Sequence, residues 1–300
     1  MALFHHRIHG LSVESEIELP VSTRVPGTPP DIRILLGTVP GRLENVRAAG
    51  VLYEAAPGEF LLELDGVARY WVRDGREIVV QKDVDADDDS VRVFLLGSAL
   101  GALIHQRKML PLHASAVVMD GKCIGFAGRS GIGKSTLAAA FCALGYPALG
   151  DDVLVVGAEN GGPAIVWPEG QHLKLWADSA RRLRLPTRSL PRFRGFKKKY
   201  LRSPETPKTG IPYPLTHLYV IERSDDARFT LERLQGSAKL ESLIANTYRP
   251  QFLEGLDRQR DHFRLCAELG SRFAVSRIRR PSRRFELKRL QKLILEDLCR

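Results

Sequence analysis

The chain has 300 residues, of which 44% are hydrophobic and 27% are charged. These proportions are typical of a folded globular protein and exclude a disordered, collagen-like or fibrous chain. No apolar run approaches the roughly 18 residues that a membrane-spanning helix needs, and residues 1–7 lack the basic and then apolar pattern of a signal peptide. We therefore expect a cytoplasmic protein with no part in a membrane. The four cysteines form no CxxC pair, which argues against a disulfide framework or a thiolate zinc site.

The net charge of +10 is unevenly distributed. Residues 1–150 carry 15 Lys and Arg against 17 Asp and Glu, whereas residues 151–300 carry 30 against 18. A basic second half attracts phosphates, nucleic acid, acidic peptides or anionic lipids, and does not distinguish among them. The segment 181–208 holds eleven Lys and Arg, one acidic residue and four prolines, which predicts a mobile basic loop.

The first hundred residues have the pattern of short strands. Residues 60–64 and 67–72 are predicted strands joined by Asp65-Gly66, and Asp74-Gly75 leads into a third predicted strand at 78–81. These turns predict a small antiparallel sheet. The sequence therefore indicates a β-rich domain at residues 1–100.

A change of pattern follows near residue 100. The acidic run 83–89 is expected to be a solvated loop, and residues 91–105 have the apolar density of a helix in spite of their glycines. We place a domain boundary here, so that residues 101–300 form a second and larger domain.

Strands and helices alternate in this second domain, which is typical of an α/β fold. Residues 113–119 and 122–127 are predicted strands joined by Asp120-Gly121, and the predicted helix 135–144 ends at Gly145. Nearer the carboxyl terminus we predict a strand at 215–221 and an amphipathic helix at 285–298, with Ser282 as its cap.

Between the strand 122–127 and the helix 135–144 lies a glycine-rich motif. Gly128-Arg-Ser-Gly-Ile-Gly-Lys-Ser135 fits G-x-x-x-x-G-K-[ST] at every fixed position. Its context of strand, loop and helix argues against a glycine turn that matches by chance. Backbone N–H groups of such a loop bind phosphate oxygens, Lys134 reaches the β and γ phosphates, and the Ser135 hydroxyl binds Mg²⁺. The residues predicted to bind the nucleotide are Gly128, Arg129, Ser130, Gly131, Ile132, Gly133, Lys134, Ser135 and Thr136.

Two adjacent carboxylates, Asp151 and Asp152, follow this loop closely. Only residues 135–150 separate them from Lys134, which leaves room for one helix and a tight return. One carboxylate can hold Mg²⁺ while the other accepts a proton from an attacking hydroxyl. A turn without chemistry is the alternative, and the nearby loop favours the chemical interpretation. His113 alone is typical of a core or strand-end histidine, but the predicted hairpin brings it near the nucleotide.

The segments Leu112-His-Ala-Ser-Ala-Val-Val118, Gly128–Thr136 and Gly150-Asp-Asp-Val153 resemble the HPr kinase/phosphorylase catalytic domain. A closer likeness is to the kinase-like proteins of lasso-peptide gene clusters, which phosphorylate the C-terminal serine of a precursor peptide. The motifs lie within residues 110–156, and a weaker likeness extends through 172–176 and 199–200 to the carboxyl terminus.

This resemblance implies a P-loop core, ATP and Mg²⁺ as cofactors, and a serine of a peptide or small protein as the acceptor. It also implies that His113, Lys134 and Asp151 are catalytic, with Asp151 as general base, and that Asp152 binds Mg²⁺ beside Ser135. HPr kinases are oligomeric, so the resemblance is compatible with a homo-oligomer.

The sequence departs from the family at two points. Thr136 stands where bifunctional members tend to carry glutamate, and no Glu-Val-Arg-Gly-Leu-Gly signature follows the aspartates. That signature is associated with the reverse, phosphorolytic reaction. We therefore expect a kinase without phosphorylase activity and an acceptor other than HPr. The first hundred residues also differ from a typical amino-terminal domain of the family.

The combined prediction is an α/β, HPr-kinase-like fold with a smaller β-rich amino-terminal domain, acting as an ATP-dependent serine kinase on a lasso-peptide precursor. A cation from 181–208 would assist the reaction, although a solvated loop explains that segment equally well. The alternative is a nucleic-acid-associated P-loop ATPase. The basic second half favours it. The absence of an arrangement of aromatics among the basic residues that would stack bases, and of a recognisable reader motif, argues against it. A degenerate, non-catalytic subunit is opposed by the intact loop and aspartates.

Overall fold

The computed structural model divides the chain into two compact units. The first unit comprises residues 1–111 and 247–267, and the second comprises residues 112–246 and 268–300. The structure describes residues 3–21, 29–159, 161–168, 173–176, 180–181, 183, 192–193, 199–202, 207, 210–282 and 285–299. None of the described helices is long and apolar enough to cross a membrane.

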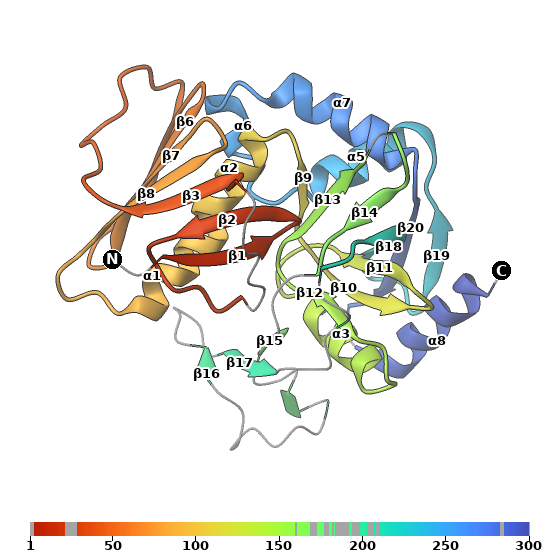
Figure 1. Ribbon diagram of the computed structural model, residues 1–300. Helices are drawn as coiled ribbons and strands as arrows, with labels where there is room; N and C mark the ends of the chain where they lie inside the picture. Colours follow the sequence, from red (N-terminus) through yellow and green to blue (C-terminus); the bar gives the residue numbers. More distant parts are fainter. Residues whose placement is uncertain are drawn as a thin grey trace. The chain divides into compact units, whose positions relative to one another are not determined.

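The first unit is built on an eight-stranded sheet with the order β1-β2-β3-β8-β7-β6-β5-β4 (Figure 1). Its strands are β1 (Phe4–Ile8), β2 (Leu11–Ser15), β3 (Ile32–Leu36), β4 (Ala48–Gly50), β5 (Tyr53–Ala56), β6 (Glu59–Leu64), β7 (Ala68–Arg73) and β8 (Glu77–Lys82). The two predicted hairpins are confirmed, since β6, β7 and β8 pair antiparallel in sequence. The sequence analysis did not predict β3, which runs parallel to β2 and β8 and makes the sheet mixed. Residues 16–31 separate β2 from β3, a connection long enough to bring the chain back in the same direction.

A nearly continuous helical segment follows this sheet. It consists of α1 (Asp88–Phe94), the π-helical turn η1 (Leu95–Ala99) and α2 (Leu100–Gln106), and α2 contacts β7 and β8. The predicted helix at 91–105 is thus confirmed, but the predicted acidic loop 83–89 is wrong at residues 88 and 89, which belong to α1. The Asp87 carboxylate accepts a hydrogen bond from the Ser90 backbone N–H, which caps α1. Acidic residues in a first helical turn also interact favourably with the helix dipole.

The first unit is completed by a segment that lies far away in the sequence. Residues 247–267 contain α6 (Phe252–Gly255) and the beginning of α7 (Gln259–Gly270). The Phe252 ring packs against Tyr53 and Phe60, with ring centroids 4.8 Å and 4.4 Å away. Tyr248 faces α2, where a Cβ on Gly101 would lie 3.0 Å from its ring. This contact explains why a glycine stands inside that helix. The predicted boundary at residue 100 did not include this returning segment.

The second unit has a mixed sheet whose central strands β11, β18 and β20 are parallel. The order along it is β12-β10-β11-β18-β14-β13-β9, and β20 pairs with β18 and β19. The strands are β9 (Leu110–Leu112), β10 (Ala114–Met119), β11 (Lys122–Ala127), β12 (Ala148–Gly150), β13 (Leu154–Ala158), β14 (Ala164–Val166), β18 (Tyr213–Ser224), β19 (Thr230–Arg233) and β20 (Ala274–Pro281). The predicted strands 113–119, 122–127 and 215–221 correspond to β10, β11 and β18.

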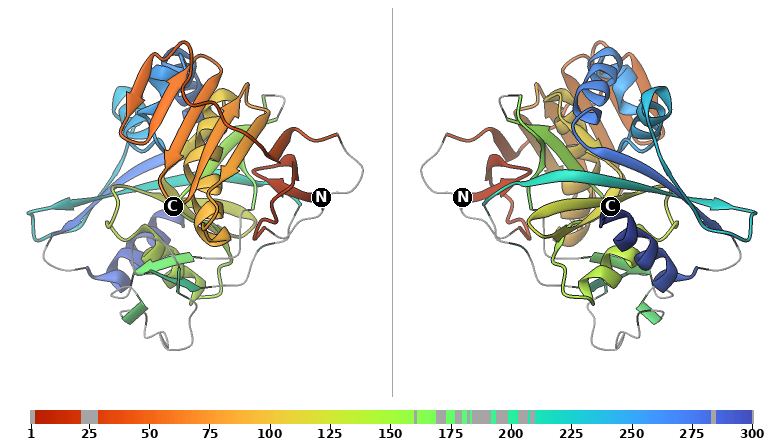
Figure 2. Two further views of the ribbon diagram at one scale, coloured as in Figure 1. Left: turned by 90° about the vertical axis from the view of Figure 1, so that its left-hand side faces the viewer. Right: turned by 90° about the vertical axis from the view of Figure 1, so that its right-hand side faces the viewer.

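Helices α3 (Lys134–Cys142) and α8 (Leu287–Leu298) lie side by side against one face of this sheet (Figures 1 and 2). They share one apolar core with it. That core contains Val117, Phe126, Tyr219 and Ile278 of the strands, Leu137 and Phe141 of α3, and Leu290 and Ile294 of α8. A further helix, α5 (Gly236–Ala245), precedes α6 in the chain. The predicted carboxy-terminal helix is confirmed.

The cap predicted for helix α8, Ser282, is wrong. Helix α8 begins at Leu287, with Glu286 at the cap position and no side-chain hydrogen bond there. The Ser282 hydroxyl instead donates to the Ser224 carbonyl oxygen at 3.0 Å, which ties the ends of β18 and β20 together.

Part of the basic segment 181–208 forms strands. β15 (Leu173–Trp176), β17 (Lys199–Arg202) and β16 (Arg192–Phe193) make a small antiparallel sheet in that order. The prediction of a loop is therefore wrong for residues 192–193 and 199–202. Most of the remaining basic segment, including Lys197 and Lys198, lies outside the described residues.

A buried histidine makes the stability of the first unit sensitive to acid. His105 of α2 is buried, and its Nε2 atom lies 2.8 Å from the Tyr248 carbonyl oxygen. Burial lowers the pKa of His105 to about 4, against a smaller upward effect of that carbonyl. Because the unfolded histidine has a pKa near 6.5, the unfolded chain binds this proton more readily. The contribution of neutral His105 to the free energy of unfolding is therefore complete above about pH 6.5. It is lost as the pH falls from there towards about pH 4.

We expect His105→Gln to reduce this acid sensitivity, because the amide can still donate to the Tyr248 carbonyl but cannot titrate. Between about pH 7 and about pH 5, the free energy of unfolding of the original chain should fall by about 2 kcal/mol more than that of the variant. Urea unfolding at the two pH values measures the difference. Equal losses in the two proteins would contradict the assignment.

Candidate active site

Three strands of the second unit bring distant residues to one edge of its sheet. β11 and β12 both pair antiparallel with β10, so they run parallel to each other and end at the same edge. The register places Ala114 opposite Ala127, and Ala116 opposite Gly150. The phosphate loop (residues 128–135) after β11, the aspartates after β12 and His113 before β10 therefore meet there. The hairpin that the sequence predicts for this purpose is confirmed.

Three glycines shape the phosphate loop. Gly128, Gly131 and Gly133 have φ angles of 134°, 78° and 112°, which side-chain-bearing residues rarely adopt. Gly131 occupies a variable position of the motif, so the structure requires one more glycine than the motif does. Turns of this kind direct backbone N–H groups into a concave site for anions. Gly133 is also the amino-terminal cap of α3, where the helix dipole favours negative charge.

The loop packs tightly against two neighbours. A Cβ on Gly128 would lie 2.5 Å from the carbonyl oxygen of Ile221 in β18. A Cβ on Gly133 would lie 2.6 Å from the ring of Phe285, just before α8. The glycines therefore provide close approach as well as backbone freedom.

The lysine of the motif is held inside the loop. Lys134 is only 6% exposed, and its Nζ donates to the Gly128 carbonyl oxygen at 2.8 Å and to that of Arg129 at 3.4 Å. A buried ammonium in this position offers its charge to an anion bound by the loop. Of the other predicted nucleotide-binding residues, Ile132 and Thr136 are buried, whereas Arg129, Ser130 and Gly131 are exposed.

Asp151 is the centre of the site because three groups donate hydrogen bonds to it. Its Oδ1 accepts from the hydroxyls of Ser115 at 2.5 Å and Ser135 at 2.8 Å. Its Oδ2 accepts from the Lys174 backbone N–H at 2.8 Å. The carboxylate thus joins β10, the phosphate loop and β15.

Two effects raise the pKa of Asp151. The larger is burial, and the second is the negative charge of Asp152. The hydrogen bonds from Ser115 and Lys174 and the charge of Lys174 act in the opposite direction. Asp151 is therefore a stronger base than an exposed aspartate, and its orientation is fixed by its donors.

Asp152 lies beside it in a different environment. Its φ angle of 70° is unusual for a residue with a side chain. Its Oδ2 forms an ion pair with Lys174 Nζ at 3.0 Å. His113 contacts the backbone instead, because its Nδ1 donates to the Asp152 carbonyl oxygen at 2.8 Å. That contact fixes the turn after β12 without using the carboxylate.

The structure thus brings His113, the phosphate loop, Asp151 and Asp152 together. Ser135 contacts Asp151, however, and not Asp152, the aspartate that the resemblance pairs with it. Sequence reasoning missed Ser115 and Lys174. Ser115 stands two residues after His113, so period-2 alternation along β10 was a usable signal. The contact of Lys174 depends on β15 lying beside the turn after β12, which no local pattern shows.

A divalent cation fits this site only together with a phosphate ligand. Among the described residues, no group of three or more His, Cys, Asp and Glu side chains could hold a metal ion. Mg²⁺ commonly uses one or two protein oxygens and completes its shell with water and substrate phosphates. The Ser135 hydroxyl and the adjacent aspartates are suitable oxygen donors of this kind.

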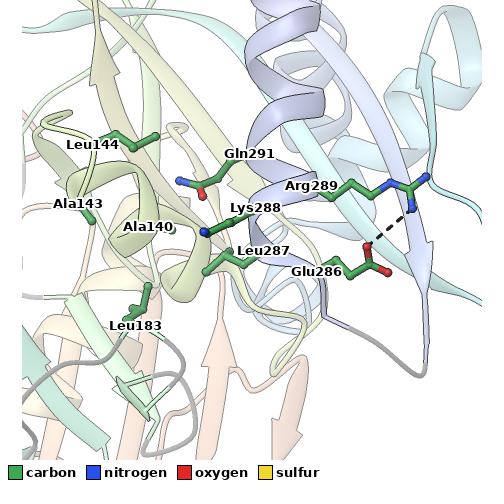
Figure 3. A pocket seen from close by; sticks show the side chains of 9 residues that line it. All are labelled: Ala140, Ala143, Leu144, Leu183, Glu286, Leu287, Lys288, Arg289 and Gln291. Carbon is green, nitrogen blue, oxygen red and sulfur yellow. Dashed lines mark ion pairs between the residues drawn. The ribbon is translucent and has the colours of Figure 1, made fainter.

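A separate cavity of about 520 Å³ lies between α3 and α8 (Figure 3). It is lined by Ala140, Ala143, Leu144, Leu183, Glu286, Leu287, Lys288, Arg289 and Gln291. These residues belong mainly to the carboxyl half of α3 and to the beginning of α8. None of them is a predicted site residue, so the cavity is not the candidate nucleotide site.

Comparisons with known proteins give no family assignment. No protein-family model matches the chain, and no curated protein matches its sequence. Among solved structures, it is similar to the HPr(Ser) kinase/phosphatase from Coxiella burnetii, with 13% sequence identity and a TM-score of 0.30. The match covers 62% of this chain and 98% of that chain. A similarity this low carries no weight for function, which has to be inferred from the geometry of the site.

The packing of the loop predicts a difference between two glycine variants. Gly131→Ala introduces a side chain at positive φ into open space and should destabilise the fold by about 1 kcal/mol. Gly128→Ala adds a clash with the Ile221 carbonyl oxygen, which cannot move away, and should cost about 1–3 kcal/mol more. Urea unfolding measures both. Equal stabilities would show that the loop does not pack closely on β18.

Proposed function

We propose that this chain is an ATP-dependent kinase that phosphorylates a serine hydroxyl of a peptide or small protein. The observation that carries the proposal is the contact between Ser135 of the phosphate loop and the partly buried carboxylate of Asp151. It supports a single site in which a base lies beside the place where a triphosphate binds.

The residues present fit a magnesium nucleotide. The loop has glycines at positive φ, a helix amino terminus and the buried Lys134, and these features suit the β and γ phosphates. Ser135 and an aspartate would hold Mg²⁺, which when bound neutralises the charge that spreads over the transferring phosphoryl group.

Asp151 is the proposed acceptor of the proton from the attacking serine hydroxyl. Its three donors hold the carboxylate in one orientation, and its raised pKa matches the task of a base. Asp152 is the proposed metal ligand, and Lys174 balances its charge. His113 positions the turn that carries both aspartates. Ser135 is hydrogen-bonded to Asp151. The alternative assignment, in which Asp151 binds the metal, is therefore tested by a separate experiment.

The proposed acceptor is the C-terminal serine of a lasso-peptide precursor. This finer assignment derives from the sequence motifs around His113, the loop and the aspartates, and the positive second half is compatible with a peptide that carries acidic residues. The fold and the site leave the identity of the peptide open.

The ion pairs of the second unit weigh against a nucleic-acid-associated ATPase. Arg277 and Arg279 of β20 both lie within ion-pair distance of Glu222 and Glu232, at 3.2–3.8 Å. These two arginines are therefore partly neutralised within the sheet and are less available to phosphate backbones.

Incubation with Mg²⁺, ATP and candidate precursor peptides, followed by mass spectrometry, tests the function directly. We expect a gain of one phosphate on the C-terminal serine, and no gain when that serine is replaced by alanine. Hydrolysis of ATP with no transfer to any serine-bearing peptide would contradict the kinase assignment. A shift of random DNA in a gel that disappears with added salt would favour the alternative.

Two variants separate binding from chemistry. Lys134→Ala should abolish transfer by weakening the binding of the phosphates. Asp151→Asn should leave the affinity for Mg²⁺ and ADP nearly unchanged and reduce kcat by roughly 10²- to 10⁴-fold, because the amide cannot accept the proton.

Titration of Mg²⁺ in the transfer assay distinguishes the two roles of the aspartates. If Asp151 is the base, Asp152→Asn and not Asp151→Asn raises the Mg²⁺ concentration needed for half-maximal rate. The opposite result would assign Asp151 to the metal. Substantial residual transfer in Asp151→Asn at saturating Mg²⁺ would reject it as the base.

A further inference from the structure

A buried arginine from the far end of the second unit's sequence lies against the phosphate loop. Arg280 stands near the end of β20, which pairs parallel with β18, the neighbour of the loop strand β11. The side chain is only 3% exposed. Its Nη2 donates to the carbonyl oxygen of Ile132 in the loop at 3.2 Å, and its Nη1 donates to that of Pro281 at 3.1 Å.

Phe285 fixes this arginine on the loop. The Arg280 guanidinium lies 4.7 Å from the centre of the Phe285 ring, within cation–π distance. The same ring covers Gly133 so closely that a Cβ there would lie 2.6 Å away. Arg280 and Phe285 therefore contact each other and two adjacent loop residues, Ile132 and Gly133, and we call this pair the loop clamp.

The geometry of the peptide group connects this clamp to the anion site. The Ile132 carbonyl and the Gly133 N–H belong to one planar trans peptide, so they point in opposite directions. A hydrogen bond that holds the carbonyl oxygen towards Arg280 directs the Gly133 N–H away from Arg280. Gly133 has a φ angle of 112° and no side chain to restrict its backbone. A contact from outside the loop therefore has a large influence on the orientation of this peptide group.

The charge of Arg280 also favours an anion on the loop. A guanidinium keeps its proton in any protein environment, so Arg280 provides a permanent positive charge behind the loop. The hydrogen bonds to Ile132 and Pro281 go to carbonyl oxygens, which fix the orientation of the guanidinium. In a buried environment that charge interacts with a phosphate more strongly than a solvated one would.

We propose that Arg280 is a positioning residue for nucleotide binding, which sets the direction of the Gly133 N–H through the Ile132 carbonyl and favours a di- or triphosphate on the loop by its charge. This inference rests on the proposed function only as far as nucleotide binding, and it does not depend on phosphoryl transfer.

Isothermal titration calorimetry with ADP and Mg²⁺ tests it on the full chain. Arg280→Gln should raise the Kd by roughly 10- to 100-fold with the stoichiometry unchanged. Arg280→Lys keeps the charge and loses the planar fork, and should give an intermediate Kd. Phe285→Leu keeps Arg280 itself but removes the ring beside its guanidinium, and it should also raise the Kd. Arg279→Gln is the matched control. The Arg279 side chain is next in sequence to Arg280, but it is 44% exposed and pairs with Glu222 and Glu232. The Kd of this variant should equal that of the original chain.

The binding stoichiometry distinguishes positioning from a merely structural role. A variant that simply misfolds in part would show fewer binding sites per chain with the same Kd, and this result for Arg280→Gln would overturn the proposal. So would a Kd within about twofold of the original in a folded Arg280→Gln. If Arg280→Gln does not fold, Arg280→Lys and Phe285→Leu decide the question by the same criteria.

The same measurements separate this inference from the proposed function. If the original chain binds ADP and the Arg280 variants bind equally well, the inference fails and the kinase proposal stands. If the variants bind weakly as expected but the original chain transfers no phosphate to a peptide, the kinase proposal fails and the inference stands. A chain that binds no nucleotide at all contradicts both.

Discussion

The site depends on the hydrogen bonds that place one partly buried carboxylate between a strand end and a phosphate loop. Asp151 accepts from Ser115, Ser135 and the Lys174 backbone N–H, so a single side chain connects three segments of the second unit. Burial of an ionised carboxylate is unfavourable unless such donors compensate for the lost water. The carboxylate therefore requires the ordered loop and β15 around it, and its own orientation is determined by them.

In an alternative arrangement, the acidic residue would stand at the end of the strand that neighbours β11, the strand leading into the phosphate loop. Here that neighbour is β18, and the acid near its end is Glu222. Glu222 pairs with Arg277 and Arg279 of β20. The aspartates of the candidate site instead follow β12, which pairs with β10 on the other side of the β10–β11 hairpin. A short return after α3 is what makes this possible, and it places both acids at the same sheet edge as the loop.

Local patterns predicted the parts of the site that are continuous in sequence. The loop and its helix, the β10–β11 hairpin and the aspartate pair each depend on residues within about one supersecondary unit, where turn chemistry and periodicity are informative. Ser115 was missed although its position two residues after His113 was a usable signal. Lys174 and Arg280 were not predicted as site residues, because their contacts depend on strands that are distant in sequence. The same reason applies to β3, which pairs parallel across a long connection, and to Phe252, which returns to pack on Tyr53 and Phe60. Ser282 shows the opposite error, since a residue suited to capping forms a tertiary hydrogen bond instead.

The loop itself illustrates why the strands around it matter for binding. Three glycines at positive φ give it more conformational freedom when unfolded than any other residues would, so ordering it is entropically unfavourable. Contacts from β18 through the Ile221 carbonyl, and from β20 through Arg280, limit that freedom before any ligand arrives. A loop that is already ordered loses less entropy on binding, and its N–H groups need no rearrangement to meet an anion. We therefore expect the parallel strands β18 and β20 to contribute to the affinity of the loop for an anion, although only β11 leads directly into the loop.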